Sequence, residues 1–204
     1  DALPISKYTP LDKLHCKNFL EKAYNLNNPF LLYLGGFSER KNVASAITAF
    51  SKVYKDLSEN YNLVIVGDYR DSGQKLMKLT NELNMLSHVI FAGFVPEEHL
   101  PLFYNSCDAI IYPSFYEGFG LPPLEAMNCG TPVIASNLTS IPEVVGDTGI
   151  LINPYDIKDI SLAIGTLLSS ENLRSELSAK ALLRAKQFSW QNTASRTLKV
   201  YESV

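Results

Sequence analysis

The sequence predicts an α/β domain in which a parallel sheet carries helices on both faces. Three observations support this. Short apolar runs alternate with longer amphipathic segments from Phe30 onward, which is the pattern of successive strand–helix units. One of these segments, Val43–Leu57, has its apolar residues at helical spacing. The chain has 204 residues with 46% apolar content, which suffices for one buried core.

Six short apolar runs are expected to be the strands, because each is followed by a loop and an amphipathic segment. In chain order they are Phe30–Leu34, Leu63–Val66, Val89–Ala92, Ala109–Tyr112, Val133–Ala135 and Gly149–Ile152. This alternation predicts a doubly wound, Rossmann-like parallel sheet.

The segments between and after these runs are expected to be helices. In chain order they are Val43–Leu57, Gly73–Leu83, Pro96–Ser106, Leu124–Cys129, Ile141–Val145, Ile157–Leu168, Glu171–Lys186 and Trp190–Glu202. Pro122 and Pro123 suit a first helical turn, where a missing N–H would have had no partner, and Gly130 suits a helix end. Ser189 is a suitable N-cap for the last helix, in which Trp190 is expected to anchor the packing.

Residues 1–28 are expected to form an interdomain connector with a short helix, and residues 29–204 the domain itself. Because Asp1 is not a natural start, we expect the chain to begin inside a longer protein. No apolar run is long enough to span a membrane, and the first residues do not resemble a signal peptide. Cys16, Cys107 and Cys129 are widely spaced, which indicates reduced thiols and a cytoplasmic location. The net charge of −3 argues against nucleic-acid binding.

The most informative segment is PSFYEGFGLPPLEAMNCGTP, residues 113–132. Its glycine turn, Gly118 to Gly120, leads into a helix, and such a turn presents free backbone N–H groups and the positive end of a helix dipole to an anion. Glu117 lies before the turn and Glu125 is expected in the first helical turn. Ionised carboxylates accept strong hydrogen bonds from sugar hydroxyls. An anion site and a polyol site in one segment indicate a nucleotide-sugar.

Ligands of open α/β sheets lie beyond the carboxyl ends of the strands. That rule selects four loops, which are Gly35–Asn42, Gly67–Gly73, Gly93–Pro96 and Pro113–Pro122. The first loop carries two cations, Arg40 and Lys41. A lysine offers a mobile point charge to a diphosphate, and an arginine can contact two phosphate oxygens at once.

Glu117 and Glu125, with seven residues between them, resemble the E-x7-E signature of retaining glycosyltransferases. The surrounding segment is similar to the donor site of glycosyltransferase family four, the glycosyl transferases group 1, whose members have the two-domain GT-B architecture. The likeness runs from about Phe30 to Trp190 through LLYLGGFSERKN, NLVIVGD, VIFAGFVPEEHLPLFYNSCDAIIYPS, IPEVVGDTGILINPYD and FSW, in the expected order. It covers only the C-terminal, donor-binding half of such an enzyme.

The resemblance implies a role for each matching position. Glu117 would face the donor sugar, Glu125 would bind the ribose hydroxyls, and Lys41 would bind the diphosphate. Backbone groups of Gly118, Phe119, Gly120 and Leu121 would also meet the phosphates, Asp68 would lie near the donor pocket, and Phe94 and Val95 would border the base. The family usually has an arginine where this chain has Gly36, and Arg40 is close enough in sequence to replace it.

Simpler interpretations exist for each residue. Arg40 and Lys41 could be solvated charges, Glu117 an exposed loop acid, Glu125 a dipole-complementing acid, and Asp68 part of an Asx-turn. The glycine turn could be an ordinary strand-to-helix connection, and Phe94 could pack in the core. No acidic DxD pair or HxH cluster suggests a metal.

The expected function is therefore a retaining, metal-independent hexosyltransferase without a cofactor, with Glu117 and Lys41 as its catalytic residues. The GGFSERKN segment resembles bacterial mannosyltransferases, so GDP-mannose is the expected donor and cell-surface polysaccharide or glycoconjugate synthesis the setting. The expected partners are the nucleotide-sugar and an N-terminal acceptor-binding domain, through which any contact with the inner membrane face would be made. A glycosidase, a nucleotide-sugar epimerase of GT-B type and a non-catalytic nucleotide-sugar-binding or scaffold domain are the alternatives.

Overall fold

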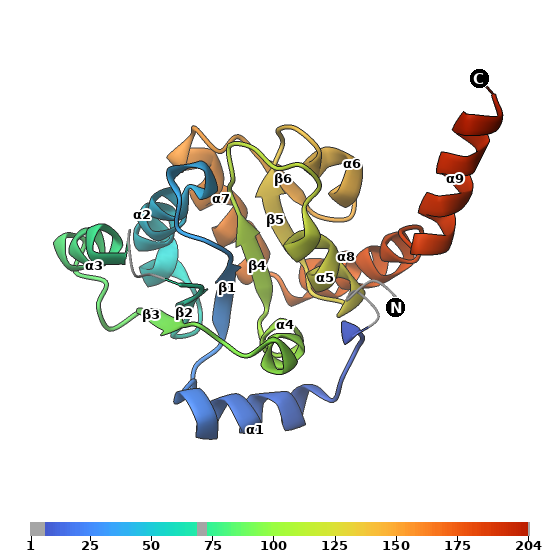
Figure 1. The fold of residues 1–204 in the computed structure, drawn as a ribbon. Helices are drawn as coiled ribbons and strands as arrows, with labels where there is room; N and C mark the ends of the chain where they lie inside the picture. Colours follow the sequence, from blue (N-terminus) through green and yellow to red (C-terminus); the bar gives the residue numbers. More distant parts are fainter. Residues whose placement is uncertain (1–6, 69–72, 204) are drawn as a thin grey trace.

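Six parallel strands form one sheet in the computed structural model, which describes residues 7–68 and 73–203 (Figure 1). The strand order is β3-β2-β1-β4-β5-β6. The strands are β1 Phe30–Leu34, β2 Asn62–Val66, β3 Val89–Gly93, β4 Ala109–Tyr112, β5 Val133–Ser136 and β6 Ile150–Ile152. The prediction of a doubly wound, Rossmann-like sheet is confirmed, and each predicted strand is found to within about one residue at either end.

The helices alternate with these strands and then close the chain. The α-helices are α1 Lys13–Tyr24, α2 Val43–Val53, α3 Gly73–Glu82, α4 Leu100–Ser106, α5 Leu121–Asn128, α6 Ile141–Val145, α7 Ile157–Leu168, α8 Glu171–Ala185 and α9 Trp190–Glu202. Short 3-10 helices are η2 Glu39–Lys41, η3 Tyr54–Asp56 and η4 Glu97–His99.

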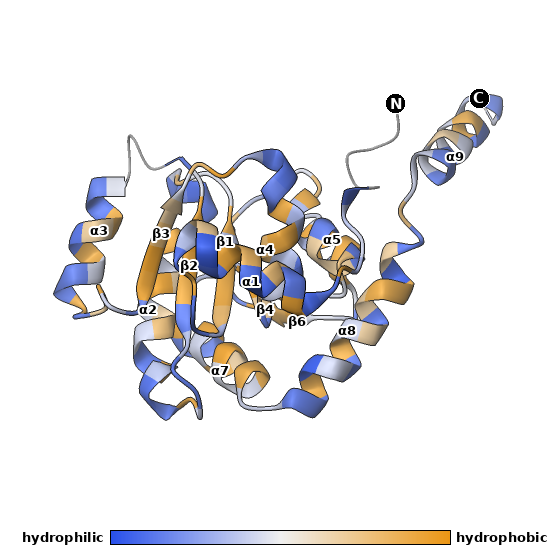
Figure 2. Cartoon of the chain, turned by 90° about the horizontal axis from the view of Figure 1, so that it is seen from below, coloured by the Kyte–Doolittle hydropathy of each residue, from blue (hydrophilic) through white to orange (hydrophobic). Residues whose placement is uncertain are grey.

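Successive residues of each strand enter opposite core layers, because side chains alternate across a strand. In β1, Phe30 and Leu32 pack with residues of α1, α4, α5, α6 and α8, whereas Leu31 and Tyr33 pack with residues of α2, α3 and α7. Figure 2 shows the apolar strands with α4 and α5 on one side and α2 and α7 on the other. Burial on both faces explains why the strands are continuous apolar runs in the sequence.

The strand order reverses between β1 and β4, which pair in parallel through Leu31 with Ala109 and Leu32 with Ile110. A reversal of this kind is a topological switch point, where the loops following the two strands leave toward opposite faces and open a crevice. The loops that follow β1 and β4 therefore lie beside each other, although they are far apart in the chain.

Glycines allow the loops to approach one another at this edge of the sheet. The Gly67 amide donates to the Gly93 carbonyl (2.9 Å), and the Gly35 amide to the Val66 carbonyl (3.0 Å). A Cβ at Gly67, whose φ is +153°, would lie 2.0 Å from the Gly35 carbonyl oxygen. Only glycine fits there.

Four predictions about helices were wrong in detail. The predicted helix Pro96–Ser106 starts as the 3-10 helix η4, and α4 begins only at Leu100. Helix α2 ends at Val53 and tightens into the 3-10 helix η3, a common way for a helix to end. Helix α5 begins three residues early because Gly120, with φ +108°, is its N-cap and the prolines occupy the first turn. Glu125 is therefore in the second turn. Trp190 is 50% exposed rather than a packing anchor.

The N-terminal segment contains the expected short helix. Helix α1 packs against α4, with Cys16 and Leu20 buried. The division into residues 1–28 and 29–204 stays a prediction. Residues 1–6, together with residues 69–72 of the Gly67–Gly73 loop, lie outside the described part of the chain.

Candidate functional site

The two residues predicted to be catalytic form an ion pair at the switch point. Lys41 Nζ lies 2.7 Å from Glu117 Oε1, although the residues are 76 positions apart in the chain. Lys41 also donates to the Tyr112 hydroxyl at 2.8 Å. Lys41 follows β1 and Glu117 follows β4, so the strand order brings them together. The Glu117 residue is 9% exposed, which excludes its interpretation as an exposed loop acid.

Arg40 supplies a second cation to the same carboxylate. Its Nη1 lies 3.0 Å from Glu117 Oε2 and also donates to the Tyr116 carbonyl. The Phe115 amide in turn donates to the Arg40 carbonyl at 2.9 Å. Two cations against one carboxylate leave one net positive charge, which is the sign required to bind an anion.

These contacts control the ionisation of Glu117. Burial alone would raise the pKa of the Glu117 carboxyl, but hydrogen bonds from Lys41, Ser114 and Arg40, together with the charge of Lys41, outweigh burial and hold the pKa below its usual value. Glu117 is therefore anionic at neutral pH, as expected of a group that faces a developing positive charge.

Asn42 fixes the loop that carries both cations. Its backbone is left-handed, with φ 54°, a conformation that asparagine tolerates better than most residues. Its buried side-chain amide donates to the Pro113 carbonyl (3.1 Å) and to the Pro154 carbonyl (2.9 Å). Asn42 thus ties together the loops after β1, β4 and β6 and holds Lys41 next to Glu117.

The glycine turn presents backbone donors beside this ion pair. Within residues 7–68 and 73–203, the amides of Gly118, Phe119, Gly120 and Leu121 donate to no other group of the chain. Pro122 and Pro123 have no N–H, so these four amides are the donors at the start of α5. Free amides at a helix start suit a phosphate.

The loop after β5 holds this turn in place. The Glu117 amide donates to Thr139 Oγ1 at 3.1 Å. The single hydroxyl proton of Ser140 is shared between the Glu117 carbonyl (2.9 Å from Oγ) and the Phe119 carbonyl (3.0 Å from Oγ). A Cβ at Gly120 would lie 2.6 Å from Ile141 Cδ1, so the turn also packs closely on α6.

Glu125 occupies a separate environment on α5. Its Oε2 accepts a hydrogen bond from the Tyr104 hydroxyl of α4 at 2.8 Å. Burial raises the pKa of Glu125, and the Tyr104 hydrogen bond opposes this only in part. The two glutamates of the E-x7-E pair therefore differ, since Glu117 is held ionised by cations and Glu125 is a half-buried acid with a neutral donor.

The remaining predicted residues lie at the ends of β1, β2 and β3. Phe94 is 81% exposed, so core packing is wrong for it, whereas Val95 is buried and can offer a ligand only its backbone. Asp68 is exposed at the end of β2. A Cβ at Gly36 would meet nothing within 4 Å. The absence of the usual arginine therefore does not reflect a lack of room. The donor-binding roles of these residues stay predictions.

Among the residues that the structure describes, no group of three or more His, Cys, Asp and Glu side chains could hold a metal ion. Cys16, Cys107 and Cys129 are free and buried. No helix in the described ranges is both long enough and apolar enough to cross a membrane.

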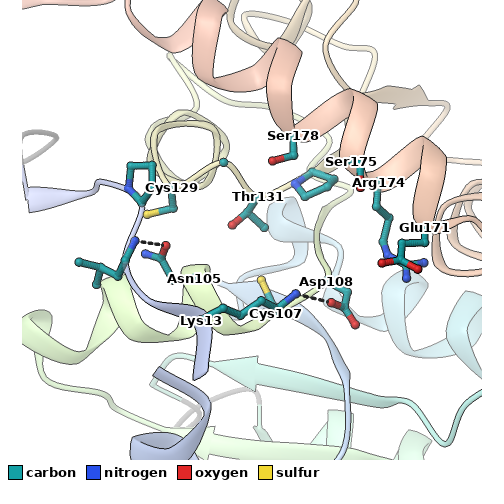
Figure 3. Close-up of a pocket in the computed structure, with 14 residues that line it drawn as sticks. Lys13, Asn105, Cys107, Asp108, Cys129, Thr131, Glu171, Arg174, Ser175 and Ser178 are labelled. Atoms are coloured by element: carbon teal, nitrogen blue, oxygen red, sulfur yellow. Dashed lines mark hydrogen bonds and ion pairs between the residues drawn. The ribbon is translucent and has the colours of Figure 1, made fainter. Parts of the chain in front are cut away.

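One hollow, of about 420 Å³, adjoins the glycine turn between Phe119 and Arg196 of α9. A second, of about 320 Å³, lies at the opposite end of the strands, before β4 and β5 (Figure 3). There Lys13 pairs with Asp108 at 2.8 Å, so the two charges satisfy each other. This second hollow is remote from the Lys41–Glu117 pair.

Sequence reasoning selected Lys41, Arg40 and Glu117 but not the residues that position them. Asn42, Thr139 and Ser140 were missed. A signal existed for Asn42, because an asparagine directly before a helix is a common left-handed or capping residue. The hydroxyls of Thr139 and Ser140 follow a strand end, where the sheet-edge rule could have selected them.

Comparison with known proteins gives consistent matches. The family model described as glycosyl transferases group 1 matches residues 17–184. The O-antigen chain mannosyltransferase B of Escherichia coli is 37% identical over 197 residues, which cover 97% of this chain and 52% of that protein. The O-antigen chain mannosyltransferase RfbU of Salmonella typhimurium is 35% identical over 147 residues, covering 72% of this chain and 40% of that protein.

Solved structures share the fold. Sucrose-phosphate synthase from Thermosynechococcus elongatus matches with a TM-score of 0.83 and 27% identity, over 99% of this chain and 51% of that chain. The C-terminal domain of a glycosyl transferase group 1 family protein from Francisella tularensis matches with a TM-score of 0.78 and 22% identity, over 91% of this chain and 97% of that chain.

Proposed function

This chain belongs to the glycosyl transferases group 1 family, and from this premise we propose that it is the donor-binding half of a retaining hexosyltransferase. The observation that carries the proposal is the Lys41–Glu117 pair at the switch point, beside a turn with four free amides. A net positive charge with free amides suits a diphosphate, and a carboxylate held ionised suits the sugar attached to it.

The proposed chemistry follows from this arrangement. When the bond between the anomeric carbon and the phosphate oxygen breaks, its electron pair leaves with the diphosphate and positive charge develops on the sugar. Lys41, Arg40 and the amides of Gly118–Leu121 would stabilise the leaving group, and Glu117 would favour the cationic carbon. These groups supply the positive field that a metal ion provides in other enzymes, so the proposal needs no metal and no cofactor.

The proposed donor is GDP-mannose, and the proposed setting is cell-surface polysaccharide synthesis. The support comes from the relatives, since the curated proteins that match most of this chain include O-antigen chain mannosyltransferases. An epimerase, a glycosidase and a scaffold domain receive no such support. An ion pair between the loops after β1 and β4, at a phosphate-type turn, is also unlike the facing carboxylates of a glycosidase.

The acceptor would be bound by an N-terminal half. The chain spans about half the length of the first curated relative that it matches. Helix α9 projects from the domain and buries none of its residues (Figure 1). Its exposed Trp190, Leu198, Val200 and Tyr201 offer an apolar surface to a partner. A cytoplasmic location is compatible with three free cysteines, with membrane contact made through the acceptor half.

Titration calorimetry with GDP and UDP, with and without EDTA, tests the proposal on the chain as it is. We expect at least one nucleoside diphosphate to bind, GDP more tightly than UDP, with the same affinity in EDTA. Guanosine and uridine serve as phosphate-free controls. Failure of both diphosphates to bind contradicts the donor-site proposal, and binding that disappears in EDTA contradicts metal independence.

A further inference from the structure

The loop after β5 places two hydroxyls against the backbone at the start of the glycine turn. Thr139 and Ser140 together engage three backbone groups of residues 117–119, at 2.9 to 3.1 Å. Neither residue belongs to the segment that resembles the donor-site signature.

Peptide geometry shows what the Ser140 hydroxyl achieves. In a planar trans peptide, the C=O of one residue and the N–H of the next point in opposite directions. Ser140 Oγ lies 2.9 Å from the Glu117 carbonyl oxygen and 3.0 Å from the Phe119 carbonyl oxygen, and its single hydroxyl proton is shared between them. The amides of Gly118 and Gly120 must then point away from Ser140. One side chain thus fixes the direction of two N–H groups, neither of which bonds to another described part of the chain.

Thr139 binds the amide of Glu117, which precedes the glycine turn. Its Oγ1 accepts from the Glu117 N–H, which leaves that amide unavailable to a ligand and anchors the backbone of the residue paired with Lys41. The free donors therefore begin at Gly118.

The backbone of Thr139 supplies an independent observation. Its φ is +55°, and the other non-glycine residues with positive φ in the described ranges are Asn25, Asn42 and Asn84. Asparagine tolerates this conformation, whereas a β-branched residue does so only at a cost in free energy. Such strain persists where the surrounding contacts demand it, and at this position the contact is the hydrogen bond to the turn.

We propose that Thr139 and Ser140 are positioning residues, whose hydroxyls hold the turn so that the Gly118 and Gly120 amides face the diphosphate together. The inference rests on the proposed donor site and extends it by naming what preorganises its backbone donors. Preorganised donors gain strength because they need no rearrangement when the charge arrives.

Calorimetry on Ser140→Ala, Ser140→Thr, Thr139→Gly and Thr139→Ser tests this, with the better-binding nucleoside diphosphate and its nucleoside as probes. Ser140→Ala and Thr139→Gly should each lose about tenfold in diphosphate affinity, the scale of one or two hydrogen bonds, and keep nucleoside affinity. Ser140→Thr and Thr139→Ser, which retain the hydroxyl, should bind nearly as tightly as the wild type. Ser51→Ala is the matched control, because its hydroxyl donates to the Thr48 carbonyl within α2.

A second measurement needs no ligand. Backbone ¹⁵N order parameters of Gly118, Phe119 and Gly120 should fall in Ser140→Ala and stay unchanged in Ser51→Ala. If Lys41→Ala weakens diphosphate binding but Ser140→Ala does not, the positioning role of Ser140 is overturned and the donor site stands. Equal loss of nucleoside and diphosphate affinity also overturns the positioning role, because the damage is then general. If the wild type binds no diphosphate, the donor site itself fails.

Discussion

Lys41 is the residue on which the anion site depends most directly. It is largely buried, and it contacts both Glu117 and Tyr112. We expect Lys41→Ala to weaken nucleoside diphosphate binding by about 1.5–3 kcal/mol, the scale of a charge-assisted hydrogen bond, and to leave nucleoside binding nearly unchanged. Calorimetry measures both. Lys52→Ala, at an exposed position on α2, is the control. Equal losses for nucleoside and diphosphate would remove Lys41 from the phosphate site.

Neutralising Glu117 and neutralising Glu125 should change the free energy of unfolding in opposite directions. The pKa of Glu117 is lowered in the fold, so its ionisation contributes stability above the unfolded pKa, about 4.3, and this contribution is lost as the pH falls through the folded pKa. The pKa of Glu125 is raised, so its contribution is complete below about pH 4.3 and is lost as the pH rises through the folded pKa.

Urea unfolding of Glu117→Gln and Glu125→Gln from pH 4 to pH 8 measures this difference. At pH 7 we expect Glu117→Gln to lower the free energy of unfolding by about 1–3 kcal/mol, because two cations lose their partner, and the deficit should shrink toward pH 4. Glu125→Gln should match or exceed the wild type at pH 7, since Tyr104 can still donate to the amide oxygen. Similar destabilisation by both changes would refute the assigned environments.

In the full-length enzyme, transfer rates and nucleoside diphosphate affinities of the same two variants distinguish the proposed role of Glu117 from that of Glu125. Glu117→Gln should keep or raise nucleoside diphosphate affinity, because the two cations lose their opposing charge, but should slow transfer at saturating donor and acceptor, because an amide stabilises a cationic sugar carbon less than a carboxylate does. Glu125→Gln should weaken nucleoside diphosphate binding if Glu125 contacts the ribose. Wild-type transfer rates for Glu117→Gln would exclude it from the mechanism.

The sequence revealed these residues by type and by their place after strands. It could not reveal their pairing, because the contact between Lys41 and Glu117 requires β1 to lie beside β4, and apolar runs carry no information on which strands are neighbours. The environment of Glu125 was likewise hidden, since its partner Tyr104 belongs to another helix, α4, and the sequence does not show which helices are neighbours.

At the scale of the elements, the start of α5 depends on one glycine. Gly120 has φ +108°, and a Cβ there would approach Ile141 Cδ1 to 2.6 Å, whereas a Cβ at Gly118 would meet nothing within 4 Å. Gly120→Ala should therefore destabilise the domain by about 2 kcal/mol or more, and Gly118→Ala by less than about 1 kcal/mol. Adding Ile141→Val to Gly120→Ala removes the clashing carbon and should recover only part of the loss, because the backbone strain remains. Urea unfolding measures all three.

Equal tolerance of the two alanines would show that the turn adjusts freely. That outcome would also weaken the case for a preorganised set of amides, since an adjustable turn does not hold its donors in one direction.

The elements themselves were largely predictable because strands buried on both faces are continuous apolar runs. The first residues of the helices were harder to predict. Pro122 and Pro123 indicated a helix start nearby, but the predicted start at Leu124 was wrong. The helix begins at Leu121 because a left-handed glycine precedes it, and the sequence does not show the φ of a glycine.

At the scale of the whole molecule, α9 stands apart from the core. None of its residues is buried, and its contacts near the start include a hydrogen bond from Asn192 to the Gln187 carbonyl. We expect a chain that ends at Ser189 to melt within about 2 °C of the full chain in calorimetry, because little apolar area is lost from the core. A fall of more than about 5 °C would show that α9 stabilises the domain in isolation.

The position of α9 also determines which structural changes the tryptophan fluorescence of this chain can report. Trp190, the single tryptophan, begins that helix and is half exposed, whereas Tyr33, Tyr61, Tyr104 and Tyr112 are buried in the core. Tryptophan fluorescence should therefore change little when the sheet unfolds, and tyrosine absorbance or circular dichroism should follow that transition. Conversely, a blue shift of the Trp190 emission would signal that something has covered α9 while the sheet stays intact. The chain thus carries a built-in optical probe for whatever docks on its last helix.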